Sequence, residues 1–263
     1  MKDLKKIEVF LFDMDGTLCM GDVPFAGVFD TLRKLEKAGK SVWFVTNNSS
    51  KSRNDYIKKF KKMGYGEVRV EQIISSSLAT AQYISRYMPY KSVFVLGADC
   101  LKQEFRDYGI EVKEIGEDAD ILVLAFDTEL TYKKLFHATN LVHKGAKYIA
   151  THPDFMCPSD EGDMPDAGAL IAAVAATTGK KPDIIVGKPH YPIAEYVFDH
   201  CNADAEHCCF IGDRLYTDIK FGINNKMATV AVLSGETTLE MLSTSDIRPD
   251  FVLESVNDLI GLI

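Results

Sequence analysis

The sequence lacks long apolar runs and any excess of positive charge. No stretch approaches the roughly 18 apolar residues of a membrane span. The net charge of −8 at pH 7 leaves no broad positive field for a nucleic-acid backbone or an anionic membrane. We interpret the basic run at residues 58–62 as a solvated helix face. We therefore expect no nucleic-acid partner and no membrane association, and an anionic ligand would need a local site.

The beginning of the chain and the cysteines also lack the features of an exported protein. The first six residues are charged and lead into a short apolar run without a signal-peptide core. The six cysteines are scattered and form no CxxC pair. The sequence thus predicts a cytoplasmic location with reduced thiols. Histidines precede Cys201 and Cys208, but residues 208–211 are apolar and strand-like, which favours small buried side chains over a zinc site.

The sequence does contain a regular alternation of apolar runs of strand length with longer amphipathic stretches. This alternation is typical of a parallel sheet flanked by helices, so the predicted fold class is α/β. Hydrophobic residues make up 46% and charged residues 26% of the 263 residues, as in ordinary globular proteins. A chain of this length and composition is expected to bury a substantial core.

Four predicted strands each end at polar residues. They cover residues 7–12 before Asp13, 41–45 before Thr46, 184–186 before Gly187 and Lys188, and 208–211 before Gly212 and Asp213. Open α/β sheets bind ligands beyond the carboxyl ends of their strands. We therefore expect the four polar clusters to project toward one rim of a single sheet.

The long interval between Thr46 and Lys188 predicts an inserted domain. Its apolar runs predict strands at residues 92–96, 121–126 and 147–150, and its amphipathic stretches predict helices at 101–108, 132–143 and 167–178. One or two βα units would fit the shorter intervals between the other clusters, whereas this one needs a body of its own. We expect a core at residues 1–79 and 183–263 and an inserted α/β domain at residues 80–182.

Asp13 and Asp15 lie at positions i and i+2, directly after the first predicted strand, and are followed by Gly16 and Thr17. Asp13 could attack phosphorus, while Asp15 could give a proton to the leaving oxygen and then take one from water. A calcium-like loop or a helix cap is the alternative explanation of this stretch taken alone. The other three clusters favour the catalytic interpretation.

Two carboxylates repel a phosphate dianion, so the site needs positive charge and hydrogen-bond donors, and the remaining clusters can supply both. Asp213 adds a third carboxylate, and an oxygen-only site suits Mg²⁺. Lys188 adds a positive charge, and Thr46, Asn47 and Asn48 offer donors for the phosphoryl oxygens. The Thr-Asn-Asn stretch alone would also fit a turn followed by a helix cap. Together these residues predict a site that neutralises and orients a phosphoryl group.

The four clusters resemble the motifs of the haloacid dehalogenase (HAD) superfamily, specifically the nitrophenylphosphatase-like phosphatases with a type IIA cap. The resembling stretches are, in order, residues 13–18, 45–49, 186–189 and 212–219, and the likeness spans nearly the whole chain. The resemblance implies a Rossmann-like, HAD-like parallel-sheet core with a cap inserted between the second and third motifs. It implies that Thr46 and Lys188 bind the phosphoryl group.

The resemblance also assigns roles to the acidic residues. Asp13 would be the nucleophile and a metal ligand, and Asp15 the acid and base that gives Mg²⁺ only its backbone carbonyl. Asp213 would be a further Mg²⁺ ligand. Asp218 would orient metal-bound waters or Lys188 without contacting the metal itself.

Residues 151–154, Pro158, Gly162 and residues 165–168 resemble the substrate-facing loop of the family's cap and the start of the following helix. Two residues depart from the family pattern: His152 replaces a common Asn, and Asp166 occupies a position where Gly is usual. We expect Asp154 and its neighbours to bind the leaving group, although a turn after Pro153 would also explain Asp154.

The sequence as a whole predicts Mg²⁺-dependent hydrolysis of small phosphate monoesters through an aspartyl-phosphate on Asp13. Sugar or nucleotide phosphates would be the metabolites, and p-nitrophenyl phosphate a substrate in vitro. A phosphomutase-like phosphoryl transferase and a non-catalytic phosphometabolite-binding protein are the alternatives. The cap favours water as the acceptor, and the complete set of reactive residues favours an enzyme. Caps of this family often take part in dimer contacts, so a homodimer through the cap is open alongside a monomer.

Overall fold

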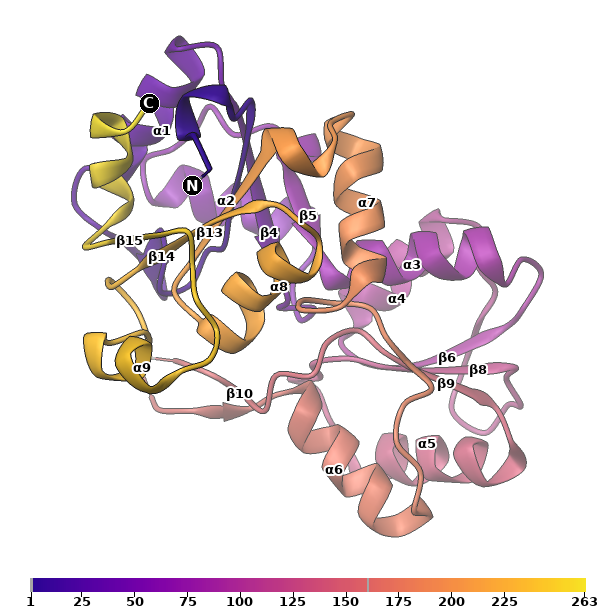
Figure 1. The fold of residues 1–263 in the computed structure, drawn as a ribbon. Coiled ribbons are helices and arrows are strands. Elements are labelled where there is room, and N and C mark those ends of the chain that lie inside the picture. The colour runs from indigo at the N-terminus through magenta and orange to yellow at the C-terminus, as the bar shows by residue number, and fades with distance from the viewer. Residues whose placement is uncertain (1, 160) are drawn as a thin grey trace. The chain divides into compact units, whose positions relative to one another are not determined.

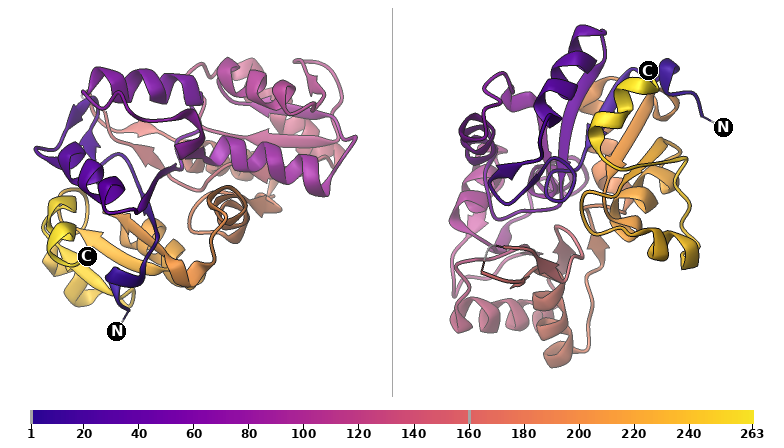
Figure 2. Two further views of the ribbon diagram at one scale, coloured as in Figure 1. Left: turned by 90° about the horizontal axis from the view of Figure 1, so that it is seen from above. Right: turned by 90° about the vertical axis from the view of Figure 1, so that its left-hand side faces the viewer.

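The computed structural model describes residues 2–159 and 161–263 and divides into two compact units. The first unit comprises Met1–Thr46, Tyr56–Ile74 and Lys188–Ile263, so both ends of the chain belong to it (Figures 1 and 2). The second unit comprises Asn47–Asp55 and Ser75–Gly187. No helix in the described ranges is long and apolar enough to cross a membrane.

A six-stranded sheet forms the centre of the first unit. Its strands, in spatial order, are β15 (Phe251–Leu253), β14 (Ala228–Val232), β13 (Cys208–Gly212), β1 (Val9–Phe12), β4 (Ser41–Thr46) and β5 (Ile73–Ser75). β1 pairs in parallel with β4 and β13, and β14 pairs in parallel with β13 and β15. β1, β13 and β14 are buried along their whole length, which explains why their sequences are apolar without alternation.

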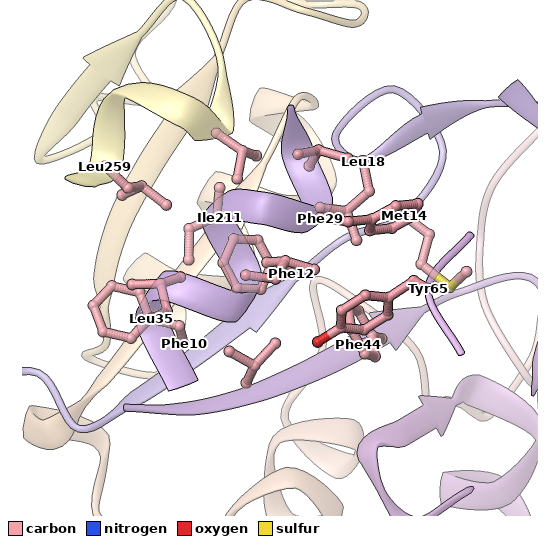
Figure 3. Close-up of a cluster of buried hydrophobic side chains, with 14 of the residues drawn as sticks. Phe10, Phe12, Met14, Leu18, Phe29, Leu35, Phe44, Tyr65, Ile211 and Leu259 are labelled. Carbon is pink, nitrogen blue, oxygen red and sulfur yellow. The ribbon is translucent and has the colours of Figure 1, made fainter. Parts of the chain in front are cut away.

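The helices of the first unit close over this sheet around an apolar core. They are α1 (Val28–Lys37), α2 (Arg53–Lys62), α7 (Tyr191–Cys201), α8 (Lys220–Asn224) and α9 (Leu239–Thr244), and a small hairpin joins β2 (Cys19–Met20) to β3 (Val23–Pro24). Figure 3 shows part of the core, where the side chains of Phe12 and Phe44 lie near the ring of Tyr65. Tyr65 stacks on Phe29 with ring centroids 4.9 Å apart. This packing holds β1 and β4 firmly in place.

The second unit is built on its own five-stranded parallel sheet. The strands, in spatial order, are β12 (Ile184–Ile185), β9 (Lys147–Ala150), β8 (Ile121–Leu124), β6 (Val93–Leu96) and β7 (Val112–Lys113). Figure 1 shows α5 (Tyr132–Lys144) and α6 (Ala167–Thr178) on one face and α3 (Ser76–Tyr87) and α4 (Asp99–Asp107) on the other. A short antiparallel hairpin, β10 (Met156–Cys157) with β11 (Met164–Pro165), precedes α6.

The predicted α/β class is confirmed, and two elements have the bounds that the sequence predicts, β9 at residues 147–150 and α6 at residues 167–178. The second unit begins at Ser75 and ends at Gly187, and it also includes Asn47–Asp55. The predicted insertion at residues 80–182 lies inside these limits. The assignment of the units to a catalytic core and a cap stays a prediction.

One predicted strand joins a different sheet from the one expected. Residues 184–186 were expected to end at the rim of the core sheet, but β12 pairs with β9 in the second unit. Backbone hydrogen bonds from Val186 N to Ala150 O and from Gly187 N to Thr151 O extend this pairing. The expectation that residues 184–186 belong to the core sheet is therefore wrong, although Lys188 itself belongs to the first unit, where its Nζ contacts Asp13. A short apolar run fits the edge of either sheet, and tertiary packing decides which edge it takes.

Candidate active site

The backbone at Asp13 is fixed by the sheet. Asp13 follows the last residue of β1, and its N–H donates to the carbonyl of Ile211 at 2.9 Å, so the β1–β13 pairing continues one residue beyond the strand. The Asp13 side chain is 14% exposed. Its carboxylate is thus held at the carboxyl end of a buried strand while keeping limited access to solvent.

The Lys188 ammonium contacts two of the predicted carboxylates, those of Asp13 and Asp218. Its Nζ lies 2.6 Å from Asp13 Oδ1 and 2.7 Å from Asp218 Oδ1, and it donates to the carbonyl of Val45 at 3.1 Å. Lys188 is 1% exposed. Burial alone would lower the pKa of the ammonium, but the charges of Asp13 and Asp218 outweigh it and raise the pKa. Lys188 is therefore a permanent positive charge at this site.

Asp213 directly follows β13 and is held by donors on two loops. Its Oδ2 accepts from the backbone N–H of Glu236 at 2.8 Å, and its Oδ1 accepts from the Thr17 hydroxyl at 3.2 Å. Burial and the charge of Asp218 raise the pKa of Asp213 to about 6. A Cβ at Gly16, where φ is +89°, would lie 2.3 Å from Asp213 Oδ2. The glycine after Asp15 is thus required both by its backbone conformation and by the space that Asp213 occupies.

Asp218 lies on a π-helical turn, Leu215–Ile219, that follows β13 and leads into α8. Its Oδ2 accepts from the backbone N–H of Arg214 at 3.1 Å, while its Oδ1 accepts from Lys188. Asp218 is 1% exposed. A Cβ at Gly212 would lie 2.3 Å from the Cβ of Asp218, so this turn folds back closely onto the end of the strand. Asp218 therefore gives Lys188 a second carboxylate partner beside Asp13.

Asp13, Asp213 and Asp218 form a compact acidic cluster. One carboxylate oxygen from each lies within 4.8 Å of the other two. Burial raises the pKa of Asp13 well above its usual value, and the other two carboxylates add to the rise against the opposing effect of Lys188. One ammonium cannot neutralise three carboxylates in a largely buried cluster, so the donor set fits an additional hard divalent cation such as Mg²⁺.

Asp15 has a partner that the sequence did not suggest. Its Oδ1 accepts from Lys59 Nζ at 2.9 Å, and Lys59 is only 8% exposed. The interpretation of residues 58–62 as a solvated face is therefore wrong for Lys59. The available signal was helical periodicity, because Lys59 follows Tyr56 by three positions and precedes Phe60, and all three are buried on α2. Burial lowers the pKa of Lys59, but the charge of Asp15 reverses the effect and the pKa rises.

The predicted phosphoryl-binding residues divide between the two units. Thr46 ends β4 in the first unit and is 4% exposed. Asn47 and Asn48 belong to the second unit, where Asn47 Nδ2 donates to Asp154 Oδ2 at 3.0 Å. The first unit thus brings together Asp13, Lys188, Asp213 and Asp218, whereas the two asparagines lie with the predicted leaving-group residue.

A second cluster of possible ligands lies in the second unit. His152, Asp154 and Asp166 each place one nitrogen or oxygen within 4.8 Å of the others. His152 Nε2 lies 2.8 Å from Asp166 Oδ1, and His152 is completely buried. The two residues that depart from the family pattern therefore contact each other.

Comparison with known proteins gives the family. Residues 10–111 match the family model described as haloacid dehalogenase-like hydrolase, and residues 185–259 match a second HAD-type model. An acid sugar phosphatase of Staphylococcus aureus is 34% identical over 258 residues, which are 98% of each chain. The solved structure of a 4-nitrophenylphosphatase from Thermotoga maritima is 40% identical, has a TM-score of 0.93 and is matched over 98% of each chain. For a p-nitrophenyl phosphatase from Archaeoglobus fulgidus the identity is 31% and the TM-score 0.91, over 98% of this chain and 99% of that one.

The chain therefore belongs to the haloacid dehalogenase-like hydrolases, in their nitrophenylphosphatase-like branch with a type IIA cap. It is a phosphatase, an enzyme that hydrolyses phosphoric monoesters. The predicted family and enzyme class are both confirmed.

Proposed function

We propose that this phosphatase acts on small phosphorylated metabolites of the sugar-phosphate type, requires Mg²⁺, and works through an aspartyl-phosphate on Asp13. The contact of the Lys188 ammonium with both Asp13 and Asp218 is the observation that carries the proposal. A permanent cation beside Asp13 supports a nucleophile there, because it offsets the repulsion between the carboxylate and phosphate. The name of the Staphylococcus aureus relative, an acid sugar phosphatase, supports the substrate class.

In the first step, an Asp13 oxygen attacks phosphorus while the bond from phosphorus to the leaving oxygen breaks. Asp15 gives its proton to that oxygen, so the leaving group departs as an alcohol. Lys188 and Thr46 bind the phosphoryl oxygens, and Asn47 and Asn48 would add amide and backbone donors. Mg²⁺, held by Asp13, Asp213 and the backbone carbonyl of Asp15, would neutralise charge on the transferring group when bound.

In the second step, water attacks the phosphorus of the aspartyl-phosphate. Asp15, now ionised, takes a proton from that water, and the bond between phosphorus and Asp13 breaks to release inorganic phosphate. Lys59 holds Asp15 by the hydrogen bond at 2.9 Å and limits its rotation between the two steps. Asp218 keeps Lys188 in place throughout.

We propose that the first unit is the catalytic core and the second the cap that selects the leaving group through Asp154. One oxygen of Asp154 accepts from Asn47, but the other, Oδ1, is buried and has no hydrogen-bond partner among residues 2–159 and 161–263. A buried carboxylate oxygen without a donor is costly. A hydroxyl of a sugar phosphate would supply that donor, which favours a polyhydroxy leaving group.

Phosphate release from p-nitrophenyl phosphate and from a panel of monoesters tests the proposal. The panel contains hexose phosphates, nucleoside monophosphates, glycerol phosphate and pyridoxal phosphate, each ranked by kcat/KM with Mg²⁺ and with a chelator. We expect turnover only with Mg²⁺ and the highest values for sugar phosphates. Asp13→Asn should fold but lose turnover, and mass spectrometry of acid-quenched wild-type enzyme should find phosphate on Asp13. Full turnover with chelator, or by Asp13→Asn, would contradict the mechanism.

A further inference from the structure

A chain of buried hydrogen bonds runs through the second unit and ends at the start of α6. The backbone N–H of Phe126 donates to Ser49 Oγ at 3.0 Å, and Ser49 Oγ lies 3.1 Å from Thr151 Oγ1. Thr151 Oγ1 lies 2.9 Å from His152 Nδ1, and His152 Nε2 lies 2.8 Å from Asp166 Oδ1. Ser49, Thr151 and His152 are 0% exposed and Asp166 is 3% exposed. Water therefore has little access to any link of the chain.

The donors and acceptors in this chain have one consistent direction. With a neutral imidazole, in which one ring nitrogen donates and the other accepts, His152 donates from Nε2 to the Asp166 carboxylate and accepts at Nδ1. Ser76 also lies near Nδ1, at 3.4 Å, but its hydroxyl donates to the carbonyl of Asn47. The hydroxyl of Thr151 is thus the donor to Nδ1. Ser49, which accepts from Phe126, donates in turn to Thr151, and every group is satisfied by a neutral imidazole.

The same residues fix the backbone on both sides of Asp154. Asp166 caps α6 by accepting from the N–H of Ala167 at 2.5 Å, and its own N–H donates to the carbonyl of Phe155 at 3.0 Å. The carbonyl of Asp154 accepts from the N–H of Gly168 at 2.7 Å. A Cβ at Gly168 would lie 2.4 Å from the carbonyl oxygen of Pro153. The loop is therefore pressed onto the start of α6, and His152 ties its other end to the cap of that helix.

We propose that His152 and Asp166 are positioning residues that hold the Asp154 carboxylate for the leaving group, and so determine substrate specificity. The inference rests on the proposed role of Asp154. Among the described residues between Asp154 and Asp166, the regular structure consists of the two-residue strands β10 and β11, which give the Asp154 carboxylate little support. The buried hydrogen bond between His152 and Asp166 restrains the loop that carries Asp154.

The proposal predicts a selective defect in His152→Ala. Loss of the hydrogen bond to Asp166 should leave the Asp154 carboxylate less well positioned to accept from the substrate. Because a hydrogen bond to a charged group contributes at least the ~1.4 kcal/mol that a tenfold change represents, kcat/KM for a hexose phosphate should fall about tenfold, mainly through a higher KM. p-Nitrophenyl phosphate has no hydroxyl to donate to Asp154, so its kcat/KM should stay within about twofold. His152→Gln, which offers an amide N–H to Asp166, should recover most of the loss. A merely structural role would lower both substrates together and would show no such recovery.

A double-mutant cycle with Asp154→Ala separates this proposal from the proposed function. If Asp154→Ala changes the ranking of substrates, and His152→Ala adds nothing further in that background, His152 acts through Asp154. If Asp154→Ala changes the ranking but His152→Ala does not, only the positioning proposal is overturned. If Asp154→Ala leaves the ranking unchanged, the proposed role of Asp154 fails and the positioning proposal fails with it.

Folding of each variant is checked by circular dichroism and thermal unfolding. Should His152→Ala not fold, Asp166→Asn provides the test, because Asn keeps an oxygen for both His152 and the helix cap but removes the charge. Hydrogen bonds to a neutral acceptor are about half as strong. We expect a smaller loss in the same direction, confined to the hexose phosphate. An equal loss with p-nitrophenyl phosphate, or no loss with either substrate, would overturn the proposal.

Discussion

The two units each contain a cluster of three ligand-bearing side chains, and the clusters differ in how their charge is balanced. In the first unit, Asp13, Asp213 and Asp218 lie together, a buried lysine contacts Asp13 and Asp218, and the pKa values of Asp13 and Asp213 are raised by burial. In the second unit, Asp154 and Asp166 are bonded by an amide, an imidazole and backbone N–H groups. The first cluster suits a phosphoryl group with a metal ion, whereas the second suits hydroxyl groups.

The two clusters also differ in the contacts that hold their carboxylates in position. Asp13 and Asp213 directly follow buried strands of a sheet, so their positions are fixed by many backbone hydrogen bonds. Asp154 lies on a loop between β9 and a two-stranded hairpin, and its position depends on a few side-chain contacts. Changes in the first cluster should therefore affect every substrate alike. Changes in the second should affect substrates according to their leaving groups.

Lys188→Met should cause the most severe loss. Removing the ammonium deprives Asp13 of its neighbouring cation and, under the proposed function, removes a group that binds the phosphoryl oxygens, so kcat should fall by at least about 10²–10³-fold. The fall should be equal for p-nitrophenyl phosphate and a hexose phosphate, as steady-state kinetics would show. Lys34→Met, on the exposed side of α1, is the matched control and should retain activity. A loss confined to one substrate would contradict the uniform role of this cluster.

Asp213→Asn should weaken Mg²⁺ binding without changing the order of substrates. The amide keeps the size of the side chain but removes the charge that a hard cation prefers. We expect the Mg²⁺ concentration for half-maximal activity to rise by about 10–100-fold, the range typical when groups that support a metal are lost. Calorimetric titration with Mg²⁺ would measure the same change without turnover. Unchanged Mg²⁺ affinity would exclude Asp213 as a ligand.

The sequence was sufficient for the fold class and for most of the first cluster, because Asp13 and Asp213 each directly follow an apolar run. Asp13 and Asp213 needed only the rule that parallel strands end at one edge. The edge joined by β12 was not predictable, since Ile184 and Ile185 fit either sheet. The contact of His152 with Asp166 depends on how a loop folds back onto α6, and neither composition nor periodicity encodes that path.

Lys59→Met should have an intermediate effect and tests the buried lysine that contacts Asp15. Without its partner, Asp15 loses a charge-assisted hydrogen bond that orients it, so kcat should fall about tenfold for all substrates. Lys59→Arg can still reach the carboxylate and should recover part of the activity. Lys61→Met, on the exposed face of the same helix, is the matched control and should behave as wild type. Equal activity of the Lys59→Met and Lys61→Met variants would show that the pair with Asp15 is not needed for turnover.

Asp154→Ala should have the mildest effect on a minimal substrate and the clearest effect on substrate order. The core cluster is unchanged, so kcat/KM for p-nitrophenyl phosphate should stay within about twofold, while a hexose phosphate should lose about tenfold, as expected when one hydrogen bond to a charged group is removed. Asp154→Asn keeps the acceptor for Asn47 but weakens the oxygen that would receive a substrate hydroxyl, so its loss should be smaller. Ranking the same panel of monoesters for both variants measures the difference. An equal fall in kcat/KM across the panel would mean that Asp154 supports the fold of the second unit rather than binding the leaving group. The chemical difference between the two clusters would then not determine which substrates the enzyme prefers.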